Sequence, residues 1–384
     1  MPAQITFFPV DNGDMTLLQF PSGKTILIDA KVRSAADDPD DGTRNVAADL
    51  RQRLPKDANG RCYVDALVLS HPDQDHCLGL ERHFHLGPPE NYHSNEDKIF
   101  VRQLWSSPMI FRRASRNHIL CNDAKAFTSE ARRRVQMFRT FGSRVGDGNR
   151  ILVLGEDERG KTEGLENILI NRDQVITQIN GDYEPSMRAM LLAPLLGCDE
   201  DEEEVLSKNN SSVILRFTIT IEGNEWHFLT GGDAEVAIWE KLWSRHSRTP
   251  TLLSYHMLQA PHHCSWHTLS YDSWSEKGED AQVSQTARFA LSQALPGARI
   301  ISSSKAIDDD ENDPPCIRAK REYEAIVKDT AVSGDFFCTG EHPSRRAPAP
   351  LEFEVSRYGF TLKNSPTSST TSTGAIGSQP LPHG

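Results

Sequence analysis

The chain of 384 residues is long enough for one large domain or two ordinary ones, and 37% of its residues are hydrophobic, as in a globular core. Its formal net charge of −12 argues against a protein that coats nucleic acid with a basic surface, and leaves room only for a local basic groove. The longest apolar runs have the length of strands, so the sequence predicts no membrane span. The N-terminus lacks a basic stretch followed by an apolar one, so we expect no signal peptide.

Seven cysteines are scattered along the chain without a Cys-x-x-Cys pair. An odd and dispersed set is typical of reduced thiols, so we expect a cytoplasmic protein. Cys77 and Cys264 each lie beside a candidate metal ligand, but the expected role of both is that of a small buried apolar side chain.

Three short strands are predicted at the start of the chain, over residues 5–10, 15–20 and 24–30, because apolar runs alternate there with turn residues. Apolar positions at helical spacing then predict a helix over 45–54, which a proline ends. Asp29 stands where the third apolar run stops. We expect its carboxylate either to support a functional site or to cap the next turn.

The central motif follows an apolar run over residues 66–69. Directly after this predicted strand, four potential metal ligands occur within six residues: His71, Asp73, Asp75 and His76. Imidazole nitrogens and carboxylate oxygens suit zinc, manganese or iron(II). Placing two acids and two histidines at one strand end without a metal would cost free energy that nothing nearby offsets. A solvated loop is the alternative, and the ligand pattern favours a metal site.

Residues 87–200 differ from the flanking segments in their sequence pattern, and we interpret them as a large insertion or elaboration on the core fold. Within them we predict a helix and three strands, namely the helix over 123–141 and the strands over 99–105, 151–154 and 174–179. Arg132–Arg134 are predicted on the exposed side of this helix, either as a phosphate-facing wall or as a solvated face with paired charges. The segment ends in the acidic run 199–204, which is expected to be a solvated loop.

The second half of the chain supplies further candidate ligands at predicted strand ends. Asp233 lies in a Gly-rich corner, where glycines let a carboxylate approach a metal closely, although an ordinary helix cap is the alternative. His262 and His263 are adjacent, so their side chains should diverge; we expect one to bind metal and the other to donate a proton or contact substrate. The predicted elements are strands over 212–220, 226–229, 252–259, 299–303, 336–338, 351–355 and 360–363, and helices over 234–245, 282–295 and 317–327.

In order along the chain, three motifs resemble those of the metallo-β-lactamase-fold superfamily: His71-x-Asp73-x-Asp75-His76, Thr230-Gly231-Gly232-Asp233 and Pro261-His262-His263. This resemblance implies an α/β fold, a four-layered αββα sandwich with a two-metal site at one edge of the sheets. Segments 10–14, 27–29, 209–213 and 300–305 further resemble the C-terminal hydrolase domain of ComEC-type DNA-uptake competence proteins and its stand-alone relatives. The resemblance covers residues 1–85 and 207–363, without the transmembrane channel of the competence proteins.

The resemblance also implies a cofactor of two divalent metal ions, zinc or manganese. The implied ligands are His71, Asp73, Asp75, His76, Asp233 and His263. The first two would hold one ion and the others the second, with Asp233 bridging, and His262 could replace His263. The implied catalytic residues are Asp75, which would orient the attacking water, and His262 or Lys305, which would stabilise the oxyanion or protonate the leaving group.

One ligand departs from the superfamily's commonest pattern. Asp73 stands where a histidine is usual, which favours oxygen-preferring metals such as manganese. Many members also have a further histidine ligand between the first motif and Asp233, and His118 is the outside candidate for it here.

The predicted function is metal-dependent hydrolysis, first of a phosphodiester in nucleic acid or a nucleotide-derived small molecule, because the resembled branch is associated with DNA degradation. The alternative is a small-molecule ester, lactone or thioester hydrolase, which the acidic charge favours. A third hypothesis is an interaction protein whose metal site is degenerate or merely structural. We predict one hydrolase domain over 1–363 and a disordered tail over 364–384, and the sequence identifies no protein partner.

Overall fold

The computed structural model describes residues 2–112, 119–157, 160–197, 204–330 and 333–363. His118, most of the acidic run 199–204 and the tail predicted over 364–384 lie outside these ranges. Among the helices that are described, none combines the length and apolar character needed to cross a bilayer.

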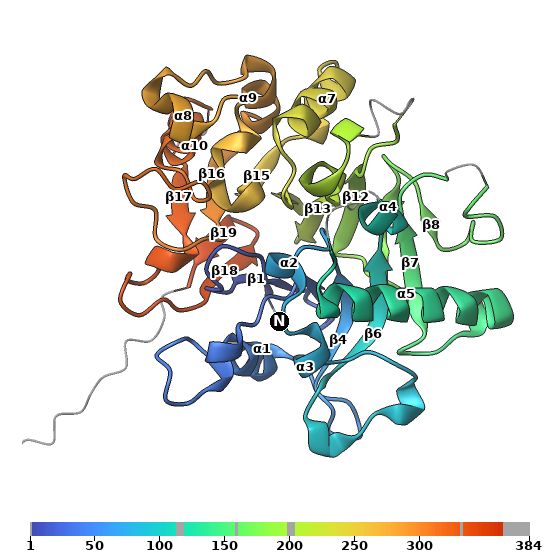
Figure 1. Ribbon diagram of the computed structural model, residues 1–384. Helices are drawn as coiled ribbons and strands as arrows, with labels where there is room; N and C mark the ends of the chain where they lie inside the picture. Colours follow the sequence, from blue (N-terminus) through green and yellow to red (C-terminus); the bar gives the residue numbers. More distant parts are fainter. Residues whose placement is uncertain (1, 113–118, 158–159, 198–203, 331–332, 364–384) are drawn as a thin grey trace, which may run out of the picture.

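Two β-sheets form the centre of the molecule (Figure 1). The strands of the first sheet are β1 (Ala3–Phe7), β2 (Thr16–Gln19), β3 (Thr25–Ile28), β4 (Tyr63–Val68), β5 (Phe84–His85), β6 (Ile99–Ser106), β7 (Arg150–Leu154), β8 (Leu169–Ile170), β18 (Leu351–Ser356) and β19 (Gly359–Leu362). Their order is β19-β18-β1-β2-β3-β4-β6-β7-β8, and β5 pairs with β6. From β3 to β8 the neighbouring strands are parallel, so their carboxyl ends share one edge of the sheet.

The second sheet has the order β17-β16-β15-β14-β13-β12-β9. Its strands are β9 (Val175–Ile176), β12 (Met187–Ala193), β13 (Ile214–Ile221), β14 (Asn224–Leu229), β15 (Tyr255–Gln259), β16 (Ala294–Ser302) and β17 (Asp335–Cys338). The strands from β14 to β17 are parallel. The short strands β10 (Gln178–Ile179) and β11 (Asp182–Tyr183) form a separate hairpin.

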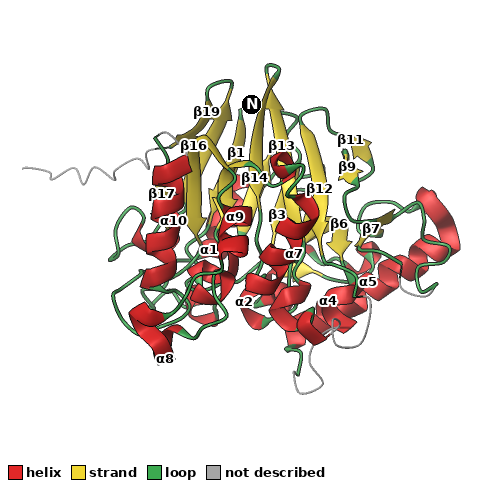
Figure 2. Cartoon of the chain, turned by 90° about the horizontal axis from the view of Figure 1, so that it is seen from above, coloured by secondary structure: helices red, strands yellow, loops and turns green. Residues whose placement is uncertain are grey.

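Helices cover the outer faces of the two sheets. They are α1 (Val46–Arg53), α2 (Gln74–Cys77), α3 (Leu80–His83), α4 (Pro108–Arg112), α5 (Asn122–Phe141), α7 (Val236–His246), α8 (Trp274–Lys277), α9 (Gln285–Leu291) and α10 (Ile317–Thr330). Figure 1 shows α1, α3 and α5 on one side of the strands and α7, α9 and α10 on the other, and Figure 2 shows the latter group lying over the strands. This arrangement confirms the predicted α/β fold with αββα layers.

The two sheets pack face to face through aromatic and aliphatic side chains. The rings of Phe7 and Phe228, one from each sheet, meet edge to face with centroids 5.8 Å apart. Along β13, Leu215 and Phe217 belong to this inner core, whereas Ile214 belongs to the second core beneath the helices. Strands that are buried on both faces need apolar residues on both, which explains their near-continuous apolar runs.

Residues 87–200 elaborate both sheets. β6, β7 and β8 continue the first sheet beyond β4, while β12 and β9 continue the second sheet beyond β13. The strand predicted over 174–179 is instead two short strands, β9 and β10, which belong to different sheets. The sequence analysis did not predict β12, although this strand forms a long antiparallel ladder with β13.

The helix predicted over 282–295 is wrong at its C-terminal end. α9 ends at Leu291, and β16 already begins at Ala294. Pro296 disfavours helical backbone in the residue before it, and Gly297 takes a left-handed φ of +72°. These two residues, together with pairing to β15, favour the strand over a longer helix.

The exposed basic face predicted for α5 is also wrong. The side chain of Arg134 is only 1% exposed, and its Nε donates to Glu130 Oε1 at 2.6 Å. The same guanidinium donates to backbone carbonyls of β6 and β7. Arg133 also pairs with Glu130, at 2.7 Å. Two of the three arginines therefore attach the helix to the sheet instead of forming a wall that faces phosphate.

Candidate metal centre

Loops from both sheets meet at the site. The loop after β4 carries the first ligand motif, the loop after β14 carries Asp233, and the loop after β15 carries the two adjacent histidines. A backbone hydrogen bond of 2.9 Å from Val213 N to Ser70 O joins the two sheets directly behind these loops. The carboxyl ends of parallel strands deliver the polar residues, as is usual for sites in α/β proteins.

Four side chains converge there: Asp75, His76, Asp233 and His263. One donor atom from each lies within 4.8 Å of the others. Asp233 Oδ1 is central, at 2.9 Å from His76 Nε2 and 3.4 Å from His263 Nε2. Asp75 Oδ2 lies 3.3 Å from His263 Nε2. The structure thus assembles, from three loops, four of the six residues predicted as ligands.

The donor set fits a divalent cation. Both ring nitrogens of His71 are buried without a hydrogen-bond partner among the described residues, and the Nε2 atoms of His76 and His263 face carboxylate oxygens at 2.9–3.4 Å. Leaving a buried polar group unpaired costs about 1–3 kcal/mol for each group. Two imidazole nitrogens beside two carboxylates are donors that zinc or manganese takes. A metal ion bound among Asp75, His76, Asp233 and His263 would take nitrogen and oxygen donors together.

His71 and Asp73, predicted to hold a first ion, lie beside the four-residue cluster. Asp73 Oδ2 is 3.7 Å from His71 Nδ1, and the His71 ring meets the His76 ring with centroids 5.4 Å apart. Burial lowers the pKa of His71, which favours the neutral imidazole that metals bind. The residues proposed for the two ion positions are therefore neighbours in the fold.

The structure distinguishes the two adjacent histidines. His263 is fully buried within the cluster, whereas His262 is 14% exposed and its Nε2 is 4.0 Å from Asp233 Oδ2. The amide of Asn209 lies 3.5 Å from His262 Nε2, and Glu235 Oε1 lies 3.9 Å from His262 Nδ1. His263 therefore belongs to the candidate cluster, and His262 lies at its rim.

The two side chains diverge because of a strained turn, not because of strand alternation. His262, His263 and Cys264 have φ values of 51°, 53° and 67°, in the left-handed region. Each such residue costs on the order of 1–3 kcal/mol. Hydrogen bonds from His262 N to Gly232 O (2.8 Å) and from Cys316 N to Cys264 O (3.0 Å) hold the turn at both ends.

Asp29 supports the site, which was one of its two expected roles. Its Oδ2 accepts from His76 Nδ1 at 2.8 Å, and its Oδ1 accepts from Ser70 N at 2.7 Å. A carboxylate on Nδ1 fixes the imidazole orientation and leaves Nε2 directed at Asp233.

Substituting Asp29→Asn should therefore weaken metal binding by about 10–100-fold while the remaining ligands keep their positions. A calorimetric titration of the metal-free protein with manganese measures this change in affinity. Unchanged affinity in Asp29→Asn would contradict the supporting role. Asp97→Asn, at an exposed loop position, serves as the control.

The cluster is strongly coupled electrostatically. Burial opposes charge on His76 and His263, but nearby carboxylates, Asp233 first, outweigh it and raise both pKa values well above the ordinary value. Burial likewise opposes charge on Asp233, but the two histidines hold its pKa well below the usual range. Binding of a cation at these imidazoles would compete with their protons.

Sequence reasoning missed two residues beside the site. Asp14 is buried, and its Oδ1 lies 3.6 Å from His263 Nδ1. Lys31 donates from Nζ to the backbone oxygen of Asn12; burial lowers its pKa, and the charge of Asp75 opposes that effect. The available signal was their place at strand ends: Asp14 directly precedes the second predicted strand, and Lys31 directly follows the third.

Lys305, predicted as catalytic, is exposed after β16, and its backbone N–H bonds to Asn12 Oδ1 at 3.2 Å. In the described part of the chain, its ammonium has no ion pair with the carboxylates of the cluster. The structure therefore places Lys305 next to the loop that carries Asp14, and not in the cluster itself.

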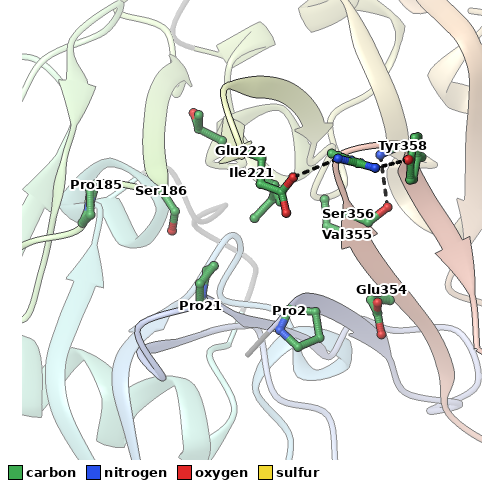
Figure 3. A pocket seen from close by; sticks show the side chains of 12 residues that line it. Pro2, Pro21, Pro185, Ser186, Ile221, Glu222, Glu354, Val355, Ser356 and Tyr358 are labelled. Atoms are coloured by element: carbon green, nitrogen blue, oxygen red, sulfur yellow. Dashed lines mark hydrogen bonds and ion pairs between the residues drawn. The ribbon is translucent and has the colours of Figure 1, made fainter.

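A pocket at the opposite end of the sheets has different chemistry (Figure 3). It lies among the turns between paired strands, and its volume is about 660 Å³. Its lining residues are Pro2, Pro21, Pro185, Ser186, Thr220, Ile221, Glu222, Glu354, Val355, Ser356, Arg357 and Tyr358. This lining holds neither histidine nor aspartate, unlike the four-residue cluster.

The fold is an αββα sandwich with a candidate metal centre at the edge of its sheets. The sequence matches no known family, and no curated protein matches it.

Among solved structures, the chain is similar to unliganded yeast PDE1, with 13% identity over 88% of this chain and 97% of that one, and a TM-score of 0.42. It is also similar to a metallo-β-lactamase from Cronobacter sakazakii, with 11% identity over 75% and 87% and a TM-score of 0.33. The metallo-β-lactamase SMB-1 is also similar, with 10% identity over 74% of this chain and 91% of that one, and a TM-score of 0.31. Likenesses at this level do not assign a function, which therefore rests on the site.

Proposed function

We propose that this protein is a metal-dependent hydrolase that cleaves a phosphodiester of a small, nucleotide-derived molecule. The observation that carries the proposal is the convergence of Asp75, His76, Asp233 and His263, whose donor atoms lie within 4.8 Å of one another. When bound there, divalent ions would supply Lewis-acid polarisation of the ester and activation of water. The finer likeness to the hydrolase domain of competence proteins stays a prediction.

The chain's own residues have separate roles in this proposal. Asp75 is the most exposed acid of the four-residue cluster, at 35%, so it is the one that can accept a hydrogen bond from an attacking water and orient it. His262 lies at the rim, with Nε2 4.0 Å from Asp233 Oδ2, and in this proposal it donates a proton to the leaving oxygen. Lys31 is half-buried near Asp75 and offers positive charge for a phosphoryl oxygen.

A small substrate fits the charge distribution better than a nucleic acid polymer. The net charge is −12, and Arg133 and Arg134 are engaged with Glu130. A polymer normally needs a cationic track that follows its backbone. The same observation keeps one alternative, a hydrolase of small esters, lactones or thioesters, because the metal chemistry is equally suited to those bonds.

The test is a manganese-dependent assay on bis(p-nitrophenyl) phosphate, linear single- and double-stranded DNA, RNA and a panel of small esters and lactones. We expect hydrolysis of the phosphodiester, weak or no cleavage of polymers, and loss of activity in Asp75→Ala. Activity that survives in Asp75→Ala, or the lack of activity on every phosphodiester tested, would contradict the proposal. Cleavage confined to the carboxylic esters would favour the alternative.

The remaining hypothesis is an interaction protein whose metal site is degenerate. Elemental analysis after reconstitution with manganese or zinc separates it from the proposal. A hydrolase should retain close to two metal equivalents per chain. A protein that retains none after reconstitution would support the degenerate site.

A further inference from the structure

Two cysteines from distant parts of the chain meet directly behind the metal ligands. Cys77 is the last residue of α2, next to His76, and Cys121 is the residue that caps the N-terminus of α5. Their Sγ atoms are 3.5 Å apart. Cys77 is fully buried, whereas Cys121 is partly exposed, so an oxidant can reach one thiol of the pair from solvent.

The surroundings of Cys121 favour its thiolate. Its Sγ accepts a hydrogen bond from Ala124 N at 3.4 Å, at the positive end of a 20-residue helix. Hydrogen bonding, first from the Cys77 thiol and then from this amide, lowers the pKa of Cys121 to about 6 despite its partial burial. A partly exposed, stabilised thiolate beside a second thiol is the arrangement of redox-active cysteines.

We infer that Cys77 and Cys121 form a redox modification site, at which a hydroperoxide converts the two thiols into a disulfide. The Cys121 thiolate attacks the hydroperoxide, forming a sulfenic acid as the O–O bond breaks and the other oxygen leaves as an alcohol or water after taking a proton. The Cys77 sulfur then attacks the Cys121 sulfur; the S–S bond forms, the S–O bond breaks, and that oxygen leaves as water with the Cys77 proton. Two electrons pass from the thiols to the peroxide.

The disulfide would act on the metal centre through α2. An S–S bond is about 2.05 Å long, so the two sulfurs must approach each other by about 1.5 Å. The Cys77 sulfur also lies 3.1 Å from the backbone oxygen of Asp73, and Asp75 and His76 belong to the same short helix. Movement of Cys77 therefore displaces the ligand-bearing turn, and this effect on hydrolysis rests on the proposed function.

The modification itself is tested without any assay of activity. Full-length protein is treated with hydrogen peroxide, digested without reduction, and mapped by mass spectrometry. We expect a peptide pair linked through Cys77 and Cys121, which dithiothreitol separates. Cys121→Ser should abolish the link, and Cys77→Ser should stop the reaction at a sulfenic acid that dimedone traps on Cys121. Cys62→Ser, the matched control at another partly exposed cysteine, should leave the link unchanged.

A link to other cysteines, a trap on Cys62 alone, or peroxide treatment that leaves both thiols free would overturn the inference. Manganese content and hydrolysis are then measured before and after oxidation, and we expect a reversible loss of about ten-fold or more in the wild type and none in Cys121→Ser. If the disulfide forms in a protein that hydrolyses nothing, the modification site stands and the proposed function fails.

Discussion

Substituting Asp233→Asn should abolish retention of metal and lower hydrolysis by at least about 10²–10³-fold. The reason is the central position of its carboxylate, whose Oδ1 lies 2.9 Å from His76 Nε2 and 3.4 Å from His263 Nε2. The amide keeps the size of the side chain but removes the charge that a divalent ion needs between two imidazoles. Elemental analysis and the phosphodiester assay measure the two effects independently.

The control for this substitution is Asp182→Asn, at an exposed position far from the cluster in the hairpin of β10 and β11. This variant should bind metal and hydrolyse substrate as the wild type does. If Asp233→Asn retained both its metal and its activity, the cluster would not be the catalytic centre. Circular dichroism checks that both variants are folded.

The second large effect concerns stability. Substituting Arg134→Ala should lower the free energy of unfolding by about 3–5 kcal/mol, because it leaves the charge of Glu130 buried with one partner fewer. The lost guanidinium contacts also release backbone carbonyls of β6 and β7. Urea unfolding followed by circular dichroism measures the change, and the folded fraction should hydrolyse substrate at the normal rate.

Two variants on the same helix serve as matched controls. Arg132→Ala, at an exposed position, should change the free energy of unfolding by no more than about 0.5 kcal/mol. The double substitution Arg134→Met with Glu130→Leu should recover much of the loss, since it removes both buried charges. Equal effects of Arg132→Ala and Arg134→Ala would contradict the structural role assigned to the buried guanidinium.

The part of the site that the sequence could predict is local. His71, Asp73, Asp75 and His76 follow an apolar run within a few residues, so strand periodicity and ligand chemistry are sufficient to predict a metal site there. The αββα layers were predicted through the order of three motifs along the chain. Both the metal site and the layered fold were predicted from short sequence motifs, which the sequence shows directly.

What the sequence could not predict depends on tertiary contacts. The sequence predicts Arg134 on a solvated basic face. Only its hydrogen bonds to backbone carbonyls of β6 and β7 explain why the guanidinium is buried. Asp14 and Lys31 are ordinary turn residues until the loops of the two sheets meet. The left-handed turn at His262 and His263 could not be predicted either, since successive non-glycine residues with positive φ are uncommon and this turn depends on tertiary hydrogen bonds such as that from His262 N to Gly232 O.

The candidate ligands come from loops of both sheets, so an ion bound there would link the two sheets. Asp75 and Asp233 lie far apart in the sequence, and an unfolded chain does not keep them together. The free energy of metal binding is therefore also free energy of folding. An ion present at a hundred times its dissociation constant would add about 2.7 kcal/mol to the stability of the fold. A shortage of metal would then lower the stability of the fold and shorten the lifetime of the protein, in addition to lowering any activity at the site.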